Sequence, residues 1–194
     1  MTSYKLFNGI VILFNDFHMS KCKSEFSCSE QLLCMDYCTE GRIEQEIKPG
    51  VFRYIEAGDL RIDNHIDHDV NFNFPLAHYH GITVSLDVEM AEQVIKEHFP
   101  DCPISIKQLS NKYCDNDNHF IIRDEERIAK IFSSLYNVPV GIRDYFYKIK
   151  VVELLLYLHA AEIDKTKNIK PYFYRSQIEK IKNLRTNCIM KLNQ

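Results

Sequence analysis

Three histidines near the middle of the chain have the types and spacing that could hold a metal ion or a polar ligand. His78 and His80 alternate along one apolar run, and His68 lies in the run before it. Alternate residues of a strand share a face, so the three imidazoles would converge if both runs faced one interior. Histidines near a strand end also hydrogen-bond to backbone, water or an organic ligand. We therefore predict no metal; if there is one, its ligands are His68, His78 and His80.

A second group of residues could line an apolar cavity for a small molecule. In the run "CMDYC", Met35 and Tyr37 share one strand face, while Cys34, Asp36 and Cys38 share the other. Tyr37 could offer its hydroxyl to a ligand, or it could pack in the core with the hydroxyl at the rim. Among the histidines, His80 lies farthest into an apolar run and is the preferred inward polar group. The candidate ligand-binding residues are Met35, Tyr37, His68, Phe72, His78 and His80.

The sequence lacks the common motifs of catalysis and phosphate binding. It contains no G-x-S-x-G, no H-E-x-x-H and no phosphate loop, so no catalytic residue and no cofactor is predicted. The net charge of −3 does not suggest a bulk polyanion-binding surface. Seven scattered cysteines without a C-x-x-C pair favour a reduced, cytoplasmic protein. The apolar run near the N-terminus is too short for a membrane span, so no membrane partner is expected.

The hydrophobic pattern changes once along the chain. Up to about Leu86 the period is near two, with turn signals at Gly41, Pro49-Gly50 and Gly58, which predicts short strands in a sandwich or barrel. Beyond that point the period approaches that of a helix. Helices are expected to begin after Asp87 and Asp124, and the sequence "SQIE" predicts a capping box at Ser176.

The long helix predicted from residue 143 to 163 is apolar on nearly every side. Such a helix needs two apolar neighbours. One would be its own β domain, and the other could be the same helix of a second subunit. A central helix of a monomeric α subdomain is the alternative. The residues assigned to the dimer contact are Ile149, Val152, Leu155, Leu156 and His159.

The stretch from residue 37 to 62 places "EG" and "GDL" around two antiparallel strands, a pattern typical of a cupin jelly roll. Around it, the sequence resembles the N-terminal sensor domain of AraC-family transcriptional regulators, notably the clostridial type. The run "FNFPLAHYHGI" is the most specific part of this resemblance. The segments that carry it are "FNGIVILFNDFH" (7–18), "MDYCTEGRIEQEI" (35–47), "YIEAGDLRI" (54–62), "FNFPLAHYHGITVSLD" (72–87) and "PYFYRSQIEKIKNL" (171–184).

The resemblance implies an α+β protein, with a cupin-type β jelly-roll barrel followed by an α-helical dimerisation and linker region. The expected divisions are a cupin-like sensor barrel (1–86), a helical region with the dimerisation helix (87–170), and a linker with the first helix towards a helix-turn-helix domain (171–194). The resemblance implies that this DNA-binding domain is missing from the chain. We expect an excised domain, with a truncated gene as the alternative.

The function implied is ligand sensing and dimerisation rather than catalysis. A small-molecule effector in the barrel would modulate the absent helix-turn-helix domain, a homodimer would form through helix 143–163, and DNA would be contacted only through the missing part. The alternative is a small metal-dependent cupin enzyme, an isomerase or dioxygenase. Against it, the residues before "EG" contain no histidine, although a metal cupin supplies H-x-H there.

Overall fold

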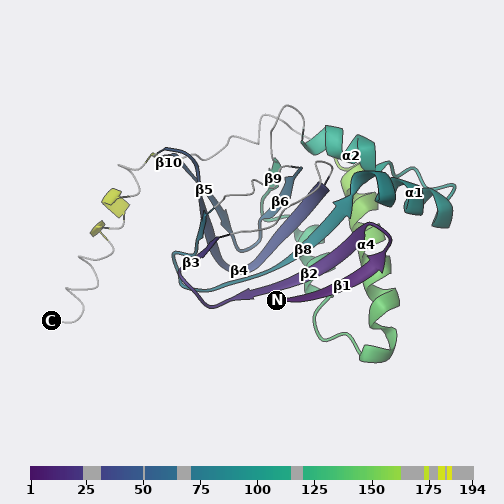
Figure 1. The fold of residues 1–194 in the computed structure, drawn as a ribbon, viewed down its shortest axis with the longest axis horizontal. Helices are drawn as coiled ribbons and strands as arrows, with labels where there is room; N and C mark the ends of the chain where they lie inside the picture. Colours follow the sequence, from purple (N-terminus) through teal and green to yellow (C-terminus); the bar gives the residue numbers. More distant parts are fainter. Residues whose placement is uncertain are drawn as a thin grey trace.

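The computed structural model describes residues 1–23, 32–49, 51–64, 71–114 and 120–162, with short pieces at 173–174, 179–181 and 183–184. Within these ranges the chain is α+β, with antiparallel strands followed by helices (Figure 1). The strands are β1 (Thr2–Phe7), β2 (Ile10–Phe17), β3 (Lys21–Lys23), β4 (Leu32–Lys48), β5 (Val51–Glu56), β6 (Leu60–Asp63), β7 (Asn71–Asn73), β8 (Tyr79–Asp87), β9 (Phe120–Ile122) and β10 (Phe173–Tyr174). The helices are α1 (Val88–His98), α2 (Ile106–Tyr113), α3 (Glu126–Ser133) and α4 (Arg143–Ala160), with a 3₁₀ turn, η2, at Val140–Ile142.

The long strand β4 belongs to two groups of strands. Its first half pairs with β8 and β6, which gives the order β1-β2-β8-β4-β6-β9. Its second half pairs with β7 and β5, which gives β3-β7-β4-β5-β10. The change of partners follows an irregularity in register between Cys38 and Glu40, beside Gly41 with φ +88°. A bulge and a glycine together bend a strand, so one strand can serve both groups of this cupin-like arrangement.

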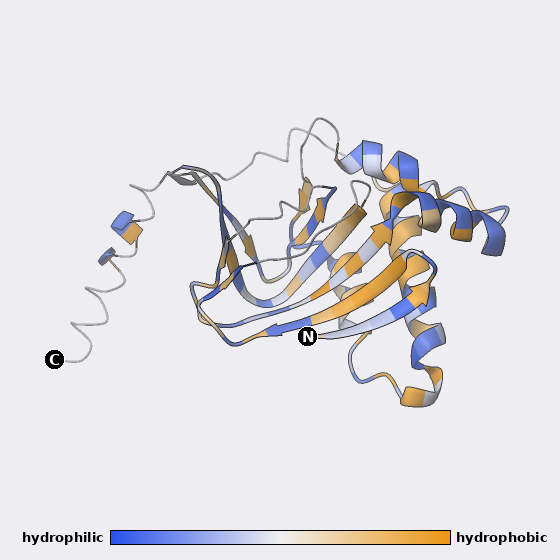
Figure 2. Ribbon diagram, viewed as in Figure 1, coloured by the Kyte–Doolittle hydropathy of each residue, from blue (hydrophilic) through white to orange (hydrophobic). Residues whose placement is uncertain are grey.

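One face of the first strand group carries the main hydrophobic core. Met35 pairs with Val84 across β4 and β8, and both side chains are fully buried among residues of the helices. In Figure 2 hydrophobic residues gather along β2, β4 and β8 on the side of the molecule where the helices lie. The helices thus cover one face of this group, as the switch from strand to helix periodicity predicts.

The observed helices partly match those expected. Asp87 caps α1 through its side chain, as predicted. The helix expected after Asp124 begins at Glu126, because Asp124 has φ 48° and Glu125 is the capping residue. Helix α2 was not predicted, and its N-terminal amides at Ile106 and Lys107 donate to the Glu92 carboxylate at 2.6 and 3.3 Å.

Helix α4 follows the long apolar run and ends at Ala160, and the last predicted residue, Ile163, lies outside the described residues. The capping box predicted at Ser176 lies outside them too. β9 falls in the region predicted to be helical and pairs with β6. No helix among the described residues is long and apolar enough to cross a membrane.

Candidate functional site

The first strand group has a second face, and it is the more polar of the two. Where Met35 and Tyr37 of β4 face the helices, the intervening Asp36 lies opposite Thr83 of β8. This face looks towards the second strand group, because the Arg61 Nη1 atom on β6 lies 3.4 Å from the Gln45 Oε1 atom in the second half of β4. We call the space between the two strand groups the interior.

An ion pair lies on the interior face of the first strand group. The Asp36 Oδ2 atom accepts from Arg61 Nε and Nη2 at 3.2 and 2.6 Å, and both side chains are only about one-seventh exposed, at 14% and 13%. Burial alone would lower the pKa of Arg61, but the carboxylates of Asp36 and Asp63 outweigh it and raise that pKa. The guanidinium is therefore charged at every working pH.

Four further polar side chains extend this pair into a network. The Thr83 hydroxyl donates to Asp36 Oδ1 at 2.6 Å and accepts from Asn15 Nδ2 at 2.8 Å. Gln45 Oε1 accepts from Arg61 Nη1 and, at 3.5 Å, from Arg53 Nη1. Low local dielectric strengthens such contacts, and a buried network must have its partners in place. We call these six residues the interior network: Asn15, Asp36, Gln45, Arg53, Arg61 and Thr83.

An apolar cluster lies in the same interior, towards the bend of β4. The rings of Phe17, Phe74 and Tyr79 stack on one another with centroids 5.6 to 6.2 Å apart. A Cβ atom at Gly81 would lie 2.4 Å from the Tyr79 hydroxyl oxygen, so glycine is needed for the ring to lie across the strand. Apolar rings and buried polar groups thus lie in the same interior.

The interior thiols are poor nucleophiles. Burial, reinforced by the negative charge of Asp36, raises the pKa of Cys34 to about 12. Burial and the charge of Asp59 likewise raise the pKa of Cys38 to about 12. A thiol with so high a pKa stays protonated near neutral pH, and the thiolate is the reactive form. Covalent catalysis by these two cysteines is therefore disfavoured.

The ligand-binding residues predicted from the sequence do not lie together in the structure. Met35 and Tyr37 lie in the core beneath the helices, where the Tyr37 ring stacks on Phe132 at 4.5 Å between centroids, so the packed-core alternative for Tyr37 is the one observed. Phe72 packs at the apolar cluster, on the interior side. The binding role of each stays a prediction.

The histidines lie at the rim of the first strand group. His80 shares its strand face with the helix-side core, and its Nδ1 atom is 3.6 Å from Asp16 Oδ1. The His78 Nε2 atom is 3.6 Å from Glu40 Oε1, and the His78 and His80 rings are 6.2 Å apart. His68 lies outside the described residues, so the predicted set of three is not tested.

Sequence reasoning missed the interior network. Its members alternate with apolar residues, a pattern that normally marks a solvent-facing side of a sheet. One sequence pattern could have revealed it: Asp36 and Arg61 have opposite charges, and each lies between strongly apolar neighbours on its strand. Such a pair can be buried if a second sheet covers it.

No protein-family model and no curated protein matches the sequence. Among solved structures, ToxT from Vibrio cholerae is similar over 74% of this chain, with 13% identity and a TM-score of 0.45. ToxT with bound unsaturated fatty acid gives 8% identity over 77% of this chain, with a TM-score of 0.46. This chain spans about half of ToxT, 54% in both comparisons.

The Clostridium difficile EutQ protein is similar over 46% of this chain and 60% of its own, with 14% identity and a TM-score of 0.29. Similarities this weak do not assign the chain to a family.

Proposed function

We propose that this chain is the effector-sensing and dimerising part of an AraC-type transcriptional regulator. The sequence segments that resemble such sensor domains support this, and the cupin-like strands followed by helices are the architecture that the resemblance implies. The observation that carries the proposal is that helix α4 has two apolar faces. One packs on the chain's own core, and the other is exposed.

The inner face of α4 is buried against the chain's own core. Tyr147, Val151, Leu154, Leu155 and Leu158 are buried there. Leu155 was assigned to the dimer contact, but it is 0% exposed and packs against its own domain. The contact that we propose therefore excludes Leu155 and uses the opposite face.

The outer face is apolar although it is exposed. Tyr145, Ile149 and Leu156 are 74%, 65% and 40% exposed, and Val152 is half-buried. We call these four residues the outer seam; they recur at alternating intervals of four and three residues. This spacing is that of the apolar positions in a two-helix coiled coil.

Charged residues flank the outer seam with opposite signs. Lys148 lies on one side of it and Glu153 on the other. Flanking charges of opposite sign suit pairing between two copies of one helix. The proposed partner is therefore a second copy of this chain.

The effector is proposed to bind in the interior. The interior network offers hydrogen-bond donors and acceptors, and the apolar cluster offers a surface for the rest of a small molecule. Strands β1 and β2 lie between this interior and α4: the Tyr4 ring packs on Tyr147 at 5.3 Å and on Phe14 at 5.9 Å. Ligand-dependent packing of β2 would thereby reach the helix that carries the outer seam.

Sedimentation equilibrium of the chain over a wide concentration range tests the proposal. We expect a monomer–dimer equilibrium, and Ile149→Asp should weaken dimerisation at least about tenfold because a charge would be buried in the contact. Met90→Asp is the matched control, since Met90 is 47% exposed on another helix. A wild-type monomer at every concentration, or equal weakening by both substitutions, would overturn the dimer.

A further inference from the structure

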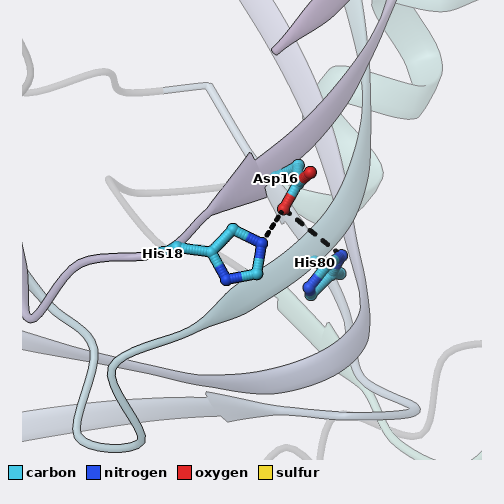
Figure 3. Close-up of side chains that lie close together, drawn as sticks. All are labelled: Asp16, His18 and His80. Atoms are coloured by element: carbon cyan, nitrogen blue, oxygen red, sulfur yellow. Dashed lines mark ion pairs between the residues drawn. The ribbon is translucent and has the colours of Figure 1, made fainter.

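A compact group of metal-ligating side chains lies outside the interior, at the end of the first strand group farthest from α1 and α2 (Figures 1 and 3). Asp16 near the end of β2 is directly opposite His80 on β8, and His18 follows one residue after β2 ends. The Asp16 Oδ1 atom lies 2.9 Å from His18 Nε2 and 3.6 Å from His80 Nδ1. The ligand atoms of all three residues lie within 4.8 Å of one another.

These separations suit a shared transition-metal ion. Zinc binds imidazole nitrogen and carboxylate oxygen at about 2.0–2.2 Å, so ligand atoms on one tetrahedral ion are roughly 3.3 Å apart. The two measured distances from Asp16 fall on either side of that value. Small side-chain rotations at an exposed site would bring the third pair into range.

The two imidazoles are arranged so that both can reach one ion without clashing. The rings of His18 and His80 are 5.3 Å apart between centroids and nearly perpendicular, at 80°. In Figure 3 the carboxylate of Asp16 lies between the two rings. His80 and Asp16 are held by paired strands, so two of the three ligands are positioned before an ion arrives.

We propose that Asp16, His18 and His80 form a surface site for a divalent transition-metal ion of the zinc, cobalt or nickel type. Two nitrogens and one carboxylate favour these ions over Ca²⁺ and Mg²⁺, which prefer oxygen ligands alone. The side chains are partly exposed, so water completes the coordination. The ion would tie β2 to β8 at the rim. This site is separate from the interior, and its loss would leave the proposed sensing function standing.

Cobalt is the better probe, because the chain contains seven cysteines, and thiolate binding to Co²⁺ is visible in the absorption spectrum while Zn²⁺ has no d–d bands. Chelator-treated, tag-free protein is titrated with Co²⁺ and followed by calorimetry and visible absorption. We expect one strong site with weak d–d bands and without the intense near-ultraviolet band of thiolate-to-cobalt charge transfer.

His80→Gln and His18→Gln should each weaken Co²⁺ binding at least about tenfold, since each removes one of three ligands. Circular dichroism should show unchanged folding, because these side chains lie at the surface. His98→Gln is the control: His98 is exposed on α1, and its Nδ1 atom lies 3.0 Å from the Val94 carbonyl oxygen. Equal affinity in all four proteins, or a thiolate band in the wild type, would overturn the site.

Discussion

At the scale of single residues, the ion pair between Asp36 and Arg61 is expected to contribute strongly to stability, because both side chains are largely buried. Arg61→Met would leave the Asp36 carboxylate in a poorly solvated interior without its cation. Breaking a buried pair from one side costs roughly 3–5 kcal/mol in the free energy of unfolding. Urea unfolding followed by circular dichroism measures this loss.

A second substitution distinguishes the loss of the ion pair from the general effect of removing an arginine on stability. Adding Asp36→Asn to Arg61→Met should recover part of the stability, because the stranded charge is then gone. Arg42→Met is the control, since Arg42 and Glu56 form an ion pair in which both side chains are nearly half exposed, at 43% and 47%. Its effect should stay below about 1 kcal/mol. Similar losses for Arg42→Met and Arg61→Met would argue against a buried pair.

At the scale of elements, Lys112 fastens the end of α4 to α2. Its Nζ atom donates to the carbonyl oxygens of Leu158, His159 and Ala161 at 2.8, 2.9 and 2.6 Å. These carbonyls are at the C-terminus of α4, where the last carbonyl oxygens lack backbone N–H donors and the helix dipole is negative. A cation there satisfies three groups at once.

Lys112→Met should therefore loosen the last turn of α4 and lower the free energy of unfolding by about 1–2 kcal/mol. Hydrogen exchange measured by NMR should quicken at the amides of the last turn and stay unchanged at Val151 in the middle of the helix. Lys130→Met is a control, because Lys130 is 73% exposed and pairs with the exposed Glu126. Uniform exchange along α4 in the Lys112 variant would contradict a local clamp.

The elements were also the part of the structure that the sequence could best predict. The period-two runs became β2, β4, β5, β6 and β8, and the helical stripes became α1, α3 and α4. The sequence did not predict helix α2, because the helix is only 8 residues long. Its N-cap, Ser105, follows Pro103 in a run whose composition is typical of a loop. Short helices depend on tertiary contacts for their stability. For α2 this contact is the Glu92 carboxylate at its N-terminus, which no local sequence pattern reveals.

At the scale of the whole molecule, alternation along β4 could tell which residues share a face but not which face looks into the interior. Both faces are covered, one by helices and the other by the second strand group, so the hydrophobic signal favours neither. The side to which Met35 and Tyr37 point was therefore left open, and the polar partners of Asp36 were overlooked. The bend of β4 brings Gln45 over Arg61, and this contact shows which face of the strand looks into the interior.

That bend depends on Gly41, where β4 passes from one strand group to the other. Gly41 has φ +88°, and a Cβ atom there would lie 2.5 Å from the His78 carbonyl oxygen. Gly41→Ala should cost roughly 1–3 kcal/mol through backbone strain and the shift of β8. Gly141→Ala is the matched control, since a Cβ atom there would meet nothing within 4 Å. Thermal unfolding should show a lower midpoint for the first variant alone. Equal midpoints would mean that β4 can pass between the two strand groups without a residue of positive φ, and that the irregular register near Cys38 and Glu40 is enough to bend it.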